Sequence, residues 1–411
     1  MAVHVTSEIG RLRGVIVHSP GAELEAVTPG NRAEYLYDDL IEAETARREH
    51  RRFVAILERF AKVYHVRQLL AEILSNDDAR QMLIRETMDI VPYEPLARDI
   101  SELDADSLVR MLIEGREEPP GPLAKALNEY GYVLPPLPNL FFTRDSCMVS
   151  GDKVLVGSMR YAIRWTEAIL MKAIFTYHPT LANSGILYDG ASERRVNYFL
   201  EGGDVHLLRR DLVVMGFSDR SSPAAIDQIA SVFFERTAVT DVIIVVMPKE
   251  KTAIHLDMIF SQIDRDLCII HPPHFIGPER LSVLHWRKGE KTIRERADIF
   301  AALAECGMPV EPVFCGGDRR TQQEREQWAS GCNFVAARPG VILSYVRNEA
   351  TLHELQRMGF RVVSGVSFLT GEDRVAEGQR AVITFDGAEL VRGGGGPRCM
   401  TCPVLRDDPW G

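Results

Sequence analysis

The segment around Cys399 contains residue types that could form a covalent bond to a substrate. Four glycines, Pro397 and Arg398 come directly before Cys399, and Cys402 follows three positions later. Glycines let the backbone approach a ligand closely, and the adjacent arginine would favour the nucleophilic thiolate form of the cysteine. Taken alone, the segment fits a flexible tail with incidental thiols, half of a zinc site or redox pair, or a catalytic cysteine.

Cys399 and Cys402 have the spacing of a metal-binding or redox pair. A structural zinc site needs further ligands. His271 and His274 are the candidates, since the sequence has no second Cys-x-x-Cys motif. On oxidation the two thiols could instead form a disulfide, which would inactivate a catalytic Cys399. The chain has seven cysteines and no visible signal peptide, so we expect free thiols in a reducing cytoplasm.

A catalytic cysteine needs a base and carboxylates, and three polar clusters supply them. His255 and Asp257 are two residues apart, which predicts that they share one face of a strand. Asp145 ends the run Phe-Phe-Thr-Arg-Asp, and Glu201 and Asp204 flank two glycines. Each cluster alone is typical of a structural histidine or a solvated cap. Together with a glycine-rich cysteine they favour a catalytic site.

The same clusters recur in front of short apolar strands. The predicted strands with a polar cluster before them are residues 154–158, 212–218, 267–271 and 341–345. Asn333 precedes the last of these, and Glu389 leads towards Cys399. Repeated units with polar groups at similar strand ends suggest radial pseudo-symmetry around a shared site, although their spacing is irregular.

The remaining segments predict further strands and a helical region. Apolar runs predict strands at residues 15–18, 63–66 and 242–247, and helical spacing predicts a helix within 38–60. Residues 67–132 lack β-branched runs and repeat leucines at helical spacing. We expect an inserted helical subdomain there, with 1–66 and 133–411 forming the catalytic domain. A helical hairpin packed on a single domain is the alternative.

The composition is that of a globular protein that handles small molecules. Of the 411 residues, 45% are hydrophobic and 26% are charged, which is enough for a large buried core. The net charge of -10 argues against nucleic acid or an anionic membrane as the main partner, and it is compatible with a cationic small-molecule substrate. The longest apolar runs are too short to span a membrane.

In their order along the chain, these motifs resemble those of bacterial arginine deiminases. The matching motifs are FFTRD at 141–145, EGGD at 201–204, HLD at 255–257, REQW at 325–328 and GGPRCM at 395–400. The resemblance extends from about Ser7 to Asp408. It implies an α/β fold, namely the fivefold pseudo-symmetric α/β propeller of the guanidine-modifying enzymes, with the helical insertion. It implies no metal or organic cofactor, and it implies self-association into a homo-oligomer.

The resemblance also implies roles for five residues. Asp145 and Asp257 would hold the planar guanidinium, because carboxylates accept paired, charge-assisted hydrogen bonds from it. Cys399 would attack the guanidinium carbon and form a covalent thiouronium intermediate. His255, oriented by Glu201, would protonate the departing ammonia and then help water to attack. The expected reaction converts L-arginine to L-citrulline and ammonia.

Further residues match positions around the rest of the substrate. The resemblance assigns binding roles to Asn139, Arg164, Arg220, Asp204 and Gly393. Arg164 and Arg220 would bind the carboxylate of an amino-acid substrate, Asn139 would add a contact, and Asp204 would support the site from behind. For the two arginines, the alternative is ordinary surface charge.

The sequence departs from the family pattern at two places. Gly394 stands where the family usually has an arginine that holds the distal end of the substrate, and a contact of that kind contributes about 1.5–3 kcal/mol. Residues 329–333 also differ from the acidic or amide residues that usually follow the tryptophan. A deiminase for a modified arginine or another guanidino compound is therefore the close alternative.

Two more distant alternatives remain. An amidinotransferase would share the thiouronium intermediate but pass the amidino group to an amine. A binding or regulatory protein would keep the fold without turnover, which the presence of Cys399, His255 and Glu201 disfavours.

Overall fold

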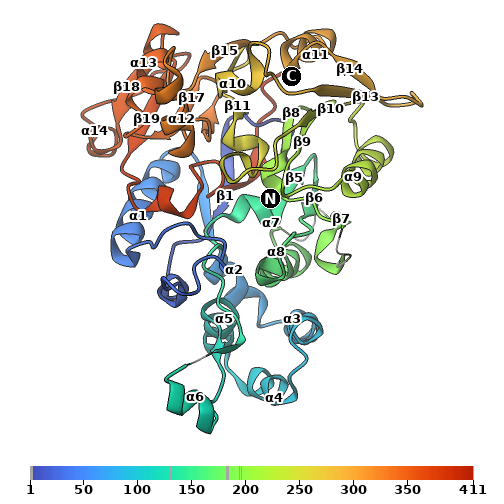
Figure 1. Ribbon diagram of the computed structural model, residues 1–411, viewed down its shortest axis with the longest axis vertical. Coiled ribbons are helices and arrows are strands. Elements are labelled where there is room, and N and C mark those ends of the chain that lie inside the picture. Colours follow the sequence, from blue (N-terminus) through green and yellow to red (C-terminus); the bar gives the residue numbers. More distant parts are fainter. Residues whose placement is uncertain (1–2, 130, 182–184, 194, 196, 411) are drawn as a thin grey trace.

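The computed structural model describes residues 3–129, 131–181, 185–193, 195 and 197–410. Five small mixed sheets form the upper part of the molecule, and a group of helices projects below them (Figure 1). In each sheet two antiparallel strands are followed by a third strand that runs parallel to the second. The sheets therefore repeat one local topology.

The five sheets follow one another along the chain. The first contains β20 (Cys402–Arg406), β1 (Leu12–Val17) and β2 (Lys62–His65); the second contains β5 (Cys147–Ser150), β6 (Lys153–Val156) and β7 (Ile186–Asp189). The third contains β8 (Val205–Arg209), β9 (Leu212–Phe217), β10 (Asp241–Val246), β13 (Val283–Arg287) and β14 (Arg294–Arg296). The fourth contains β11 (Phe260–Gln262), β12 (Leu267–Ile270) and β15 (Glu311–Phe314); the fifth contains β16 (Val335–Arg338), β17 (Val341–Tyr345), β19 (Ala381–Phe385) and β18 (Arg361–Ser364). Because β20 pairs with β1, the two ends of the chain meet in one sheet.

The predicted strands are confirmed. All seven predicted segments overlap observed strands, namely β1, β2, β6, β9, β10, β12 and β17. These strands are rich in β-branched residues, and most of their side chains are buried because helices cover the sheets. The predicted first helix is observed as α1 (Ala43–Glu58). It begins only at Ala43, since the Glu42 side chain accepts the N–H groups of Glu44 and Thr45 and caps the helix there.

Helices connect the second strand of each sheet to its parallel neighbour or link successive sheets. They are α8 (Trp165–Tyr177), α9 (Pro223–Arg236), α10 (Pro272–Phe275), α11 (Ile299–Glu305), α12 (Arg320–Trp328), α13 (Glu349–Arg357) and α14 (Gly365–Thr370). A parallel pair of strands requires a crossover of this kind. The crossovers lie on the outside of the sheets, so the polar segments at the other strand ends are free to meet.

The segment predicted as an inserted helical subdomain is helical. It contains α2 (Val66–Ile73), α3 (Asp77–Ile90), α4 (Glu94–Glu102), α5 (Ala105–Glu114) and α6 (Pro122–Leu127), with a two-stranded ribbon of β3 (Arg116–Glu117) and β4 (Tyr132–Leu134). Its residue 130 lies outside the described residues. Helices α2 and α3 pack on α8, and their apolar side chains share one buried cluster with β5 and β6. Its separation from the catalytic domain stays a prediction.

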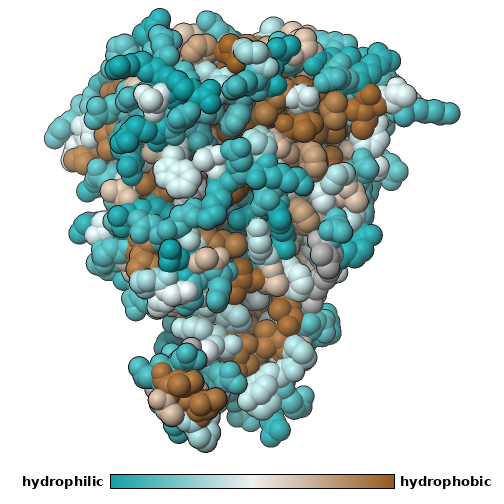
Figure 2. All heavy atoms as spheres, viewed as in Figure 1, coloured by the Kyte–Doolittle hydropathy of each residue, from teal (hydrophilic) through white to brown (hydrophobic). Residues whose placement is uncertain are grey.

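The tip of this helical region has an apolar surface. Leu123 and Leu127 of α6 are 70% and 57% exposed, and Figure 2 shows the hydrophobic atoms gathered there. In the described part of the chain, no helix is both long enough and apolar enough to cross a bilayer.

Candidate active site

A short polar segment leads into the first strand of each sheet, and these segments contain the predicted site residues. Asp145 lies in α7 (Thr143–Ser146) before β5, and Glu201 directly precedes the 3-10 helix η5 (Gly202–Asp204) before β8. His255 directly precedes the 3-10 helix η7 (Leu256–Met258) before β11. Asn333 precedes β16, and Cys399 precedes β20 after the 3-10 helix η8 (Leu390–Gly393). Helix η5 contacts both α7 and η7, so residues far apart in sequence come together.

The prediction that His255 and Asp257 lie on a strand is wrong. They belong to a tight turn, and β11 begins only at Phe260. The turn is held from outside, because Asp204 Oδ1 accepts the N–H of Leu256 at 2.9 Å. Asp204 is fully buried behind the site, where its other oxygen accepts the Ser218 hydroxyl at 2.5 Å. A carboxylate 52 residues away thus fixes the conformation that strand spacing suggested wrongly.

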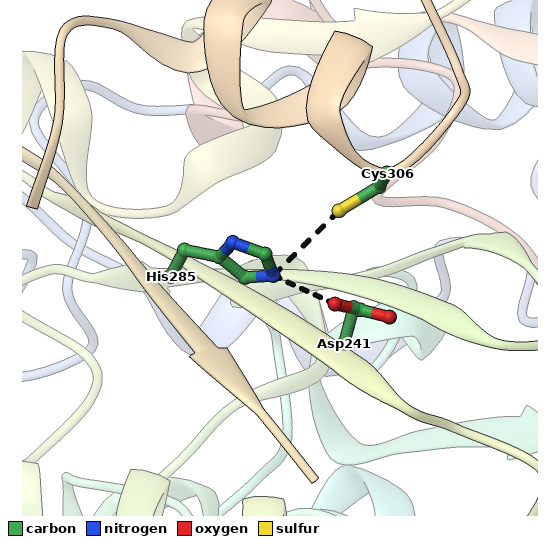
Figure 3. A group of neighbouring side chains, drawn as sticks. All are labelled: Asp241, His285 and Cys306. Carbon is green, nitrogen blue, oxygen red and sulfur yellow. Dashed lines mark hydrogen bonds and ion pairs between the residues drawn. The ribbon is translucent and has the colours of Figure 1, made fainter. Parts of the chain in front are cut away.

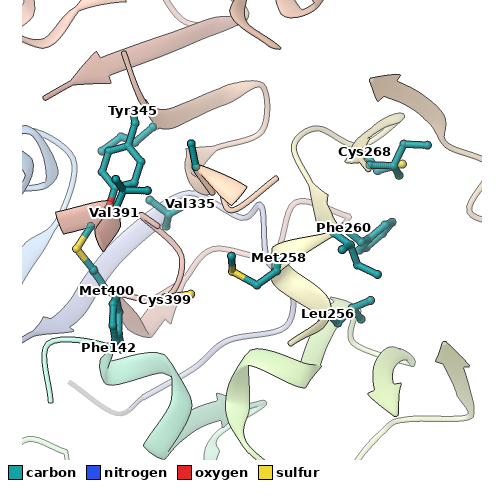
Figure 4. Packing of buried hydrophobic residues seen from close by; sticks show 14 of the residues in the cluster. Phe142, Leu256, Met258, Phe260, Cys268, Val335, Tyr345, Val391, Cys399 and Met400 are labelled. Carbon is teal, nitrogen blue, oxygen red and sulfur yellow. The ribbon is translucent and has the colours of Figure 1, made fainter. Parts of the chain in front are cut away.

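Cys399 is buried beside a carboxylate and an amide. Its Sγ lies 3.5 Å from Asp257 Oδ2 and 3.0 Å from Asn333 Nδ2. The backbone N–H of Cys399 donates to Asn333 Oδ1 at 3.1 Å. Figure 4 shows the cysteine next to Met400 in the buried hydrophobic cluster. The position of the thiol is therefore fixed. Asp257 could accept its proton, and Asn333 could stabilise the charge of the thiolate.

The surroundings of Cys399 hold the thiol in its protonated form. Burial raises its pKa well above the usual value, and the negative charges of Asp257 and Asp145 raise it further. Arg398 lowers the pKa by less. The reason is visible in the contacts, because Arg398 donates to Asp257 at 2.8 Å and to both oxygens of Glu8 at 3.0 and 3.1 Å. Arg398 favours the thiolate, as predicted, but burial and the two carboxylates outweigh its effect on the pKa of Cys399.

Glu8 and Arg398 form a buried ion pair behind the site. Burial alone would raise the pKa of the Glu8 carboxyl, but Arg398 and Arg144 hold it well below its usual range. Arg398 also donates to the carbonyl of Val205 at 2.9 Å, which ties the cysteine segment to β8. Glu8 was not recognised from the sequence, because no local pattern around it indicates such a role.

His255 lies between two carboxylates. Its Nε2 is 2.9 Å from Glu201 Oε2, and its Nδ1 is 3.7 Å from Asp145 Oδ1. Burial would lower the pKa of His255, but Asp145, Glu201 and Asp204 together raise it to about 9. Both ring nitrogens therefore carry protons at neutral pH, and the imidazolium can act as an acid. The resemblance implied that Glu201 orients His255, and the contact has the geometry for it.

Arg164 and Arg220 are buried, so the surface-charge interpretation is wrong for both: they are 3% and 6% exposed. Arg164 donates to Asp145 Oδ2 at 2.8 Å and to both oxygens of Glu167 at 3.0 and 2.8 Å. Arg220 donates to Glu201 at 3.2 Å, and among the described residues nothing accepts a hydrogen bond from its Nε. Thus Arg220 still has a free Nε donor, whereas the Nε of Arg164 already donates to Glu167.

Glu167 was not recognised in the sequence. Burial, with the charges of Asp145 and Glu201, raises the pKa of Glu167 to about 7, although Arg164 opposes the shift. Its spacing of three residues from Arg164 on one helical turn was the available signal.

A pocket of about 350 Å³, including its open mouth, brings these groups to one cavity. Its lining residues are Leu36, Asn139, Phe142, Asp145, Arg164, Arg220, Ile254, His255, Gly393, Gly394, Gly395 and Cys399. Glu201 and Asp257 lie behind this lining, where Glu201 contacts His255 and Arg220 and Asp257 contacts Cys399. Asp204 lies farther back and contacts Leu256, next to His255. The size suits a small organic molecule, and the acidic groups suit a cation.

The glycines of the pocket wall have different structural reasons. A Cβ at Gly395 would lie 2.4 Å from the Phe142 ring, and one at Gly393 would lie 2.9 Å from it. Gly394 instead has φ +84°, and a Cβ there would meet nothing within 4 Å. The first two positions exclude a side chain by contact, whereas Gly394 borders open space.

The position of Cys402 does not favour a zinc site or a redox pair formed with Cys399. Its Sγ contacts the carbonyl of Cys147 at 3.5 Å, and it packs in a different hydrophobic cluster from Cys399. Among the described residues, neither cysteine belongs to a group of three metal-ligand side chains, and neither does His271 or His274.

Comparison with known proteins agrees with the site. A family model described as arginine deiminase matches residues 33–406. The arginine deiminase of Listeria welshimeri is 32% identical over 426 aligned residues, covering 99% of this chain and 99% of the relative. The arginine deiminase of Streptococcus gordonii is 31% identical over 430 residues, covering 99% and 98%.

Solved structures share the mixed α/β fold. The N-terminal domain of ArgZ bound to product, an arginine dihydrolase from cyanobacteria, has a TM-score of 0.53 and 14% identity, covering 96% of this chain and 97% of that one. A dimethylarginine dimethylaminohydrolase in an adduct with S-methyl-L-thiocitrulline has a TM-score of 0.52 and 12% identity, covering 96% and 100%. At these identities the likeness concerns the fold alone. The family is shown by the sequence match, which covers most of the chain. This chain belongs to the arginine deiminase family.

Proposed function

We propose that this protein hydrolyses L-arginine to L-citrulline and ammonia through a thiouronium bond to Cys399. One observation supports this most strongly. Asp145 Oδ1 and Asp257 Oδ1 are buried oxygens with no hydrogen-bond partner among the described residues, and both belong to side chains that contact the catalytic histidine or cysteine. Buried carboxylate oxygens are costly without donors, and a guanidinium supplies donors with matching charge and planar geometry. The relatives named arginine deiminase, similar over their whole length, support the same substrate.

The first chemical step starts from a neutral thiol and an imidazolium. When the guanidinium binds at the two free oxygens, the thiol proton moves along its hydrogen bond to Asp257 Oδ2. The thiolate attacks the guanidinium carbon and forms a neutral tetrahedral adduct. His255 donates its proton to one nitrogen of the adduct, and the bond from carbon to that nitrogen breaks. Ammonia departs, and a thiouronium cation remains bound to Cys399.

The second step reverses the role of the histidine. Neutral His255 takes a proton from water as the water oxygen attacks the thiouronium carbon. The new adduct breaks its C–S bond, and its hydroxyl proton returns to the sulfur, which releases citrulline. The proton on Asp257 is lost to solvent with the product, so one water is consumed and one ammonia is formed for each arginine.

Asn333 positions and stabilises the nucleophile in this scheme. Its Oδ1 accepts the N–H groups of Arg398 and Cys399 at 2.9 and 3.1 Å, which leaves Nδ2 facing the sulfur. A donor 3.0 Å from a developing thiolate lowers the free energy of that charge. Asn333 is thus a positioning residue with a direct contact to the reacting atom.

The amino-acid end of the substrate is assigned to the other residues of the pocket. Arg220, with a donor to spare, is suited to bind the substrate carboxylate, and Arg164 lines the same cavity. Asn139 donates its amide to the carbonyl of Tyr35 at 2.8 Å, so its Oδ1 can accept from the substrate. Gly393 contributes backbone to the wall, and Asp204 acts through the turn that contains His255.

A modified arginine is the second candidate substrate. The open space at Gly394 favours it, because a family enzyme without an arginine there lacks a contact to the distal end and has room for an added group. The chemistry at Cys399 would be unchanged.

The finer architectural predictions are part of the same proposal. Five sheets of one topology, each entered through a segment of the site, support a fivefold pseudo-symmetric propeller with 67–132 as an insertion. A homo-oligomer in the cytoplasm, with neither nucleic acid nor membrane as partner, stays a prediction from sequence. Light scattering would test the oligomer.

The proposed function is tested by product analysis of three proteins. Wild type, Cys399→Ala and Cys268→Ala are incubated with L-arginine, and citrulline, ammonia and ornithine are measured. Cys268 is a matched control, since it is a buried cysteine of the same hydrophobic cluster without a contact to the site. Equal amounts of citrulline and ammonia from wild type and Cys268→Ala, and none from Cys399→Ala, are expected. Ornithine formed only when an amine acceptor is added would indicate an amidinotransferase instead.

A further inference from the structure

A second group of reactive side chains lies away from the active-site pocket. Asp241 begins β10, His285 lies in β13, and Cys306 ends α11. A carboxylate oxygen of Asp241, a ring nitrogen of His285 and the sulfur of Cys306 all lie within 4.8 Å of one another. The catalytic turn follows the other end of β10, so this group stands at the opposite end of that strand.

The contacts in this group converge on one atom. His285 Nε2 lies 2.8 Å from Asp241 Oδ1 and 3.6 Å from Cys306 Sγ, and Figure 3 shows both contacts ending on the same ring nitrogen. In a catalytic relay the acid and the nucleophile contact opposite nitrogens of the imidazole. Here the oxygen and the sulfur both face the same ring nitrogen, so the three possible ligand atoms are grouped on one side of the imidazole, as the ligands of one metal ion are.

The donor set and its burial also fit a metal. A thiolate, an imidazole and a carboxylate are the three ligand types that zinc takes, at about 2.0–2.3 Å. His285 is buried, whereas Asp241 and Cys306 are partly accessible, which leaves a side open for a water as fourth ligand. The 3.6 Å between Cys306 Sγ and His285 Nε2 already suits two ligands of one ion, and a movement of the Asp241 carboxylate away from Nε2, now 2.8 Å from it, would make room for that ion.

Neighbouring groups hold the ligands in place. Asp241 Oδ1 also accepts from Arg287 Nε at 2.9 Å, and its Oδ2 accepts from Thr240 at 2.7 Å. A carboxylate oxygen has two lone pairs, so Arg287 can stay while an ion replaces the His285 proton. Arg209 donates to the carbonyl of Cys306 at 2.9 Å and fixes the end of the helix.

The three nearby arginines do not leave an excess of positive charge. Arg287 pairs with Asp241, Arg296 pairs with Glu305 at 2.5 Å, and Arg209 pairs with Asp211 at 2.5 Å. Arg296 Nη2 lies 3.4 Å from His285 Nδ1, and Glu305 Oε2 lies 3.9 Å from the same nitrogen. When the ion takes Nε2, the ring proton moves to Nδ1, and Arg296 must turn away from Nδ1 while it stays paired with Glu305. Glu305 is then the outer partner of the metal-bound histidine. The thiol proton of Cys306 is released to solvent.

We propose that Asp241, His285 and Cys306 form a binding site for a divalent cation of zinc-like character, separate from the catalytic centre. The ion would join α11 to the neighbouring strands β10 and β13 of its sheet. The other described group of this kind, Asp145, Glu201 and His255, lies in the active site, where Arg164 and Arg220 already contact its carboxylates.

Cobalt absorption tests the site, because Co²⁺ replaces zinc and gives a near-ultraviolet band only when a thiolate binds it. Full-length wild type and Cys399→Ser are titrated with Co²⁺, and both are expected to develop this band at one ion per chain. Cys306→Ser should lose the band. Its affinity for zinc, measured by competition with Co²⁺, should fall by more than the roughly 10–100-fold that is typical when a residue hydrogen-bonded to a ligand is replaced. Glu305→Gln should keep the band, and its affinity for zinc should fall by roughly 10–100-fold.

Zinc should also raise the melting temperature of wild type and Cys399→Ser but not of Cys306→Ser. If Cys306→Ser does not fold, Asp241→Asn and His285→Gln give the same comparison. A thiolate band that persists in Cys306→Ser, a band that disappears in Cys399→Ser, or no band in wild type would each overturn the proposal.

Discussion

The side-chain amide of Asn333 holds Cys399 at two points. Its Oδ1 accepts the backbone N–H of the cysteine at 3.1 Å, and its Nδ2 donates to the sulfur at 3.0 Å. A second N–H, from Arg398, also ends on Oδ1. The amide orientation is therefore fixed by the backbone, and the thiolate formed during turnover would keep one donor in place.

Replacing Asn333 with aspartate separates these two functions. Asn333→Asp keeps an acceptor for the two backbone N–H groups but replaces the donor to sulfur with a negative charge. We expect a folded protein whose kcat falls by at least tenfold, because a hydrogen bond to a charged group contributes about 1.5–3 kcal/mol. Steady-state kinetics and a thermal melt measure the two effects. Unchanged kcat would show that the amide only packs against Cys399.

The alkaline limb of the pH profile reports the protonation of His255. Its pKa is raised to about 9, so the acid form is complete at neutral pH and is lost as pH rises through 9. The free enzyme already holds every proton that the first step needs. We therefore expect kcat/KM to fall as the pH rises through about 9.

Glu201→Gln provides the matched variant for that assignment. The negative charge of Glu201 helps to raise the pKa of His255, so its removal should move the falling limb to lower pH. The activity should drop at every pH as well. A limb at the same pH in both proteins would assign it to another group.

Gly394 allows a test of substrate identity with a matched pair of variants. Any side chain at this position, with φ +84°, costs about 1–2 kcal/mol of backbone strain. Gly394→Ala and Gly394→Arg share this cost, and only the second adds a guanidinium at the pocket. If L-arginine is the substrate, Gly394→Arg should have a lower KM for it than Gly394→Ala. A higher KM, together with better turnover of a modified guanidine by wild type, would favour the other substrate class.

Glu8→Gln tests the buried support of the site. The substitution removes one of the two buried carboxylates that pair with Arg398 and leaves Asp257 as the other, and breaking a buried pair costs up to about 3–5 kcal/mol. Denaturant unfolding should show a large loss of stability. Glu377→Gln is the control, because Glu377 pairs with Arg11 and Arg338 but is itself mostly exposed, and no measurable change is expected. Equal stability of the two variants would contradict the role of Glu8.

The strands could be predicted because their signals are local. Segments such as β10 and β17 are short runs of β-branched residues between polar residues, and burial on both faces requires such runs. The resemblance to the family, carried by the order of the motifs, indicated several residues that the structure places at one pocket. Asp145, His255 and Cys399 line it, although 254 positions separate the first from the last in the sequence.

The remaining features depend on contacts between distant segments. The conformation at His255 is set by Asp204, and the direction of Arg398 is set by Glu8, which lies 390 residues away in sequence. Asn333 was visible only as the start of a repeated unit, since its role depends on the approach of the cysteine segment. Periodicity cannot report such pairs, because nothing in either segment changes its own pattern when the other is present.

The most direct test of the account is to identify the covalent bond to Cys399. Wild-type protein is mixed with L-arginine, quenched in acid during turnover, digested, and analysed by mass spectrometry. We predict that the peptide containing Cys399 gains the mass of arginine less ammonia. The variant Cys399→Ala should form neither citrulline nor an adduct. Citrulline formation with no adduct on Cys399, or with the same adduct on another residue, would contradict it.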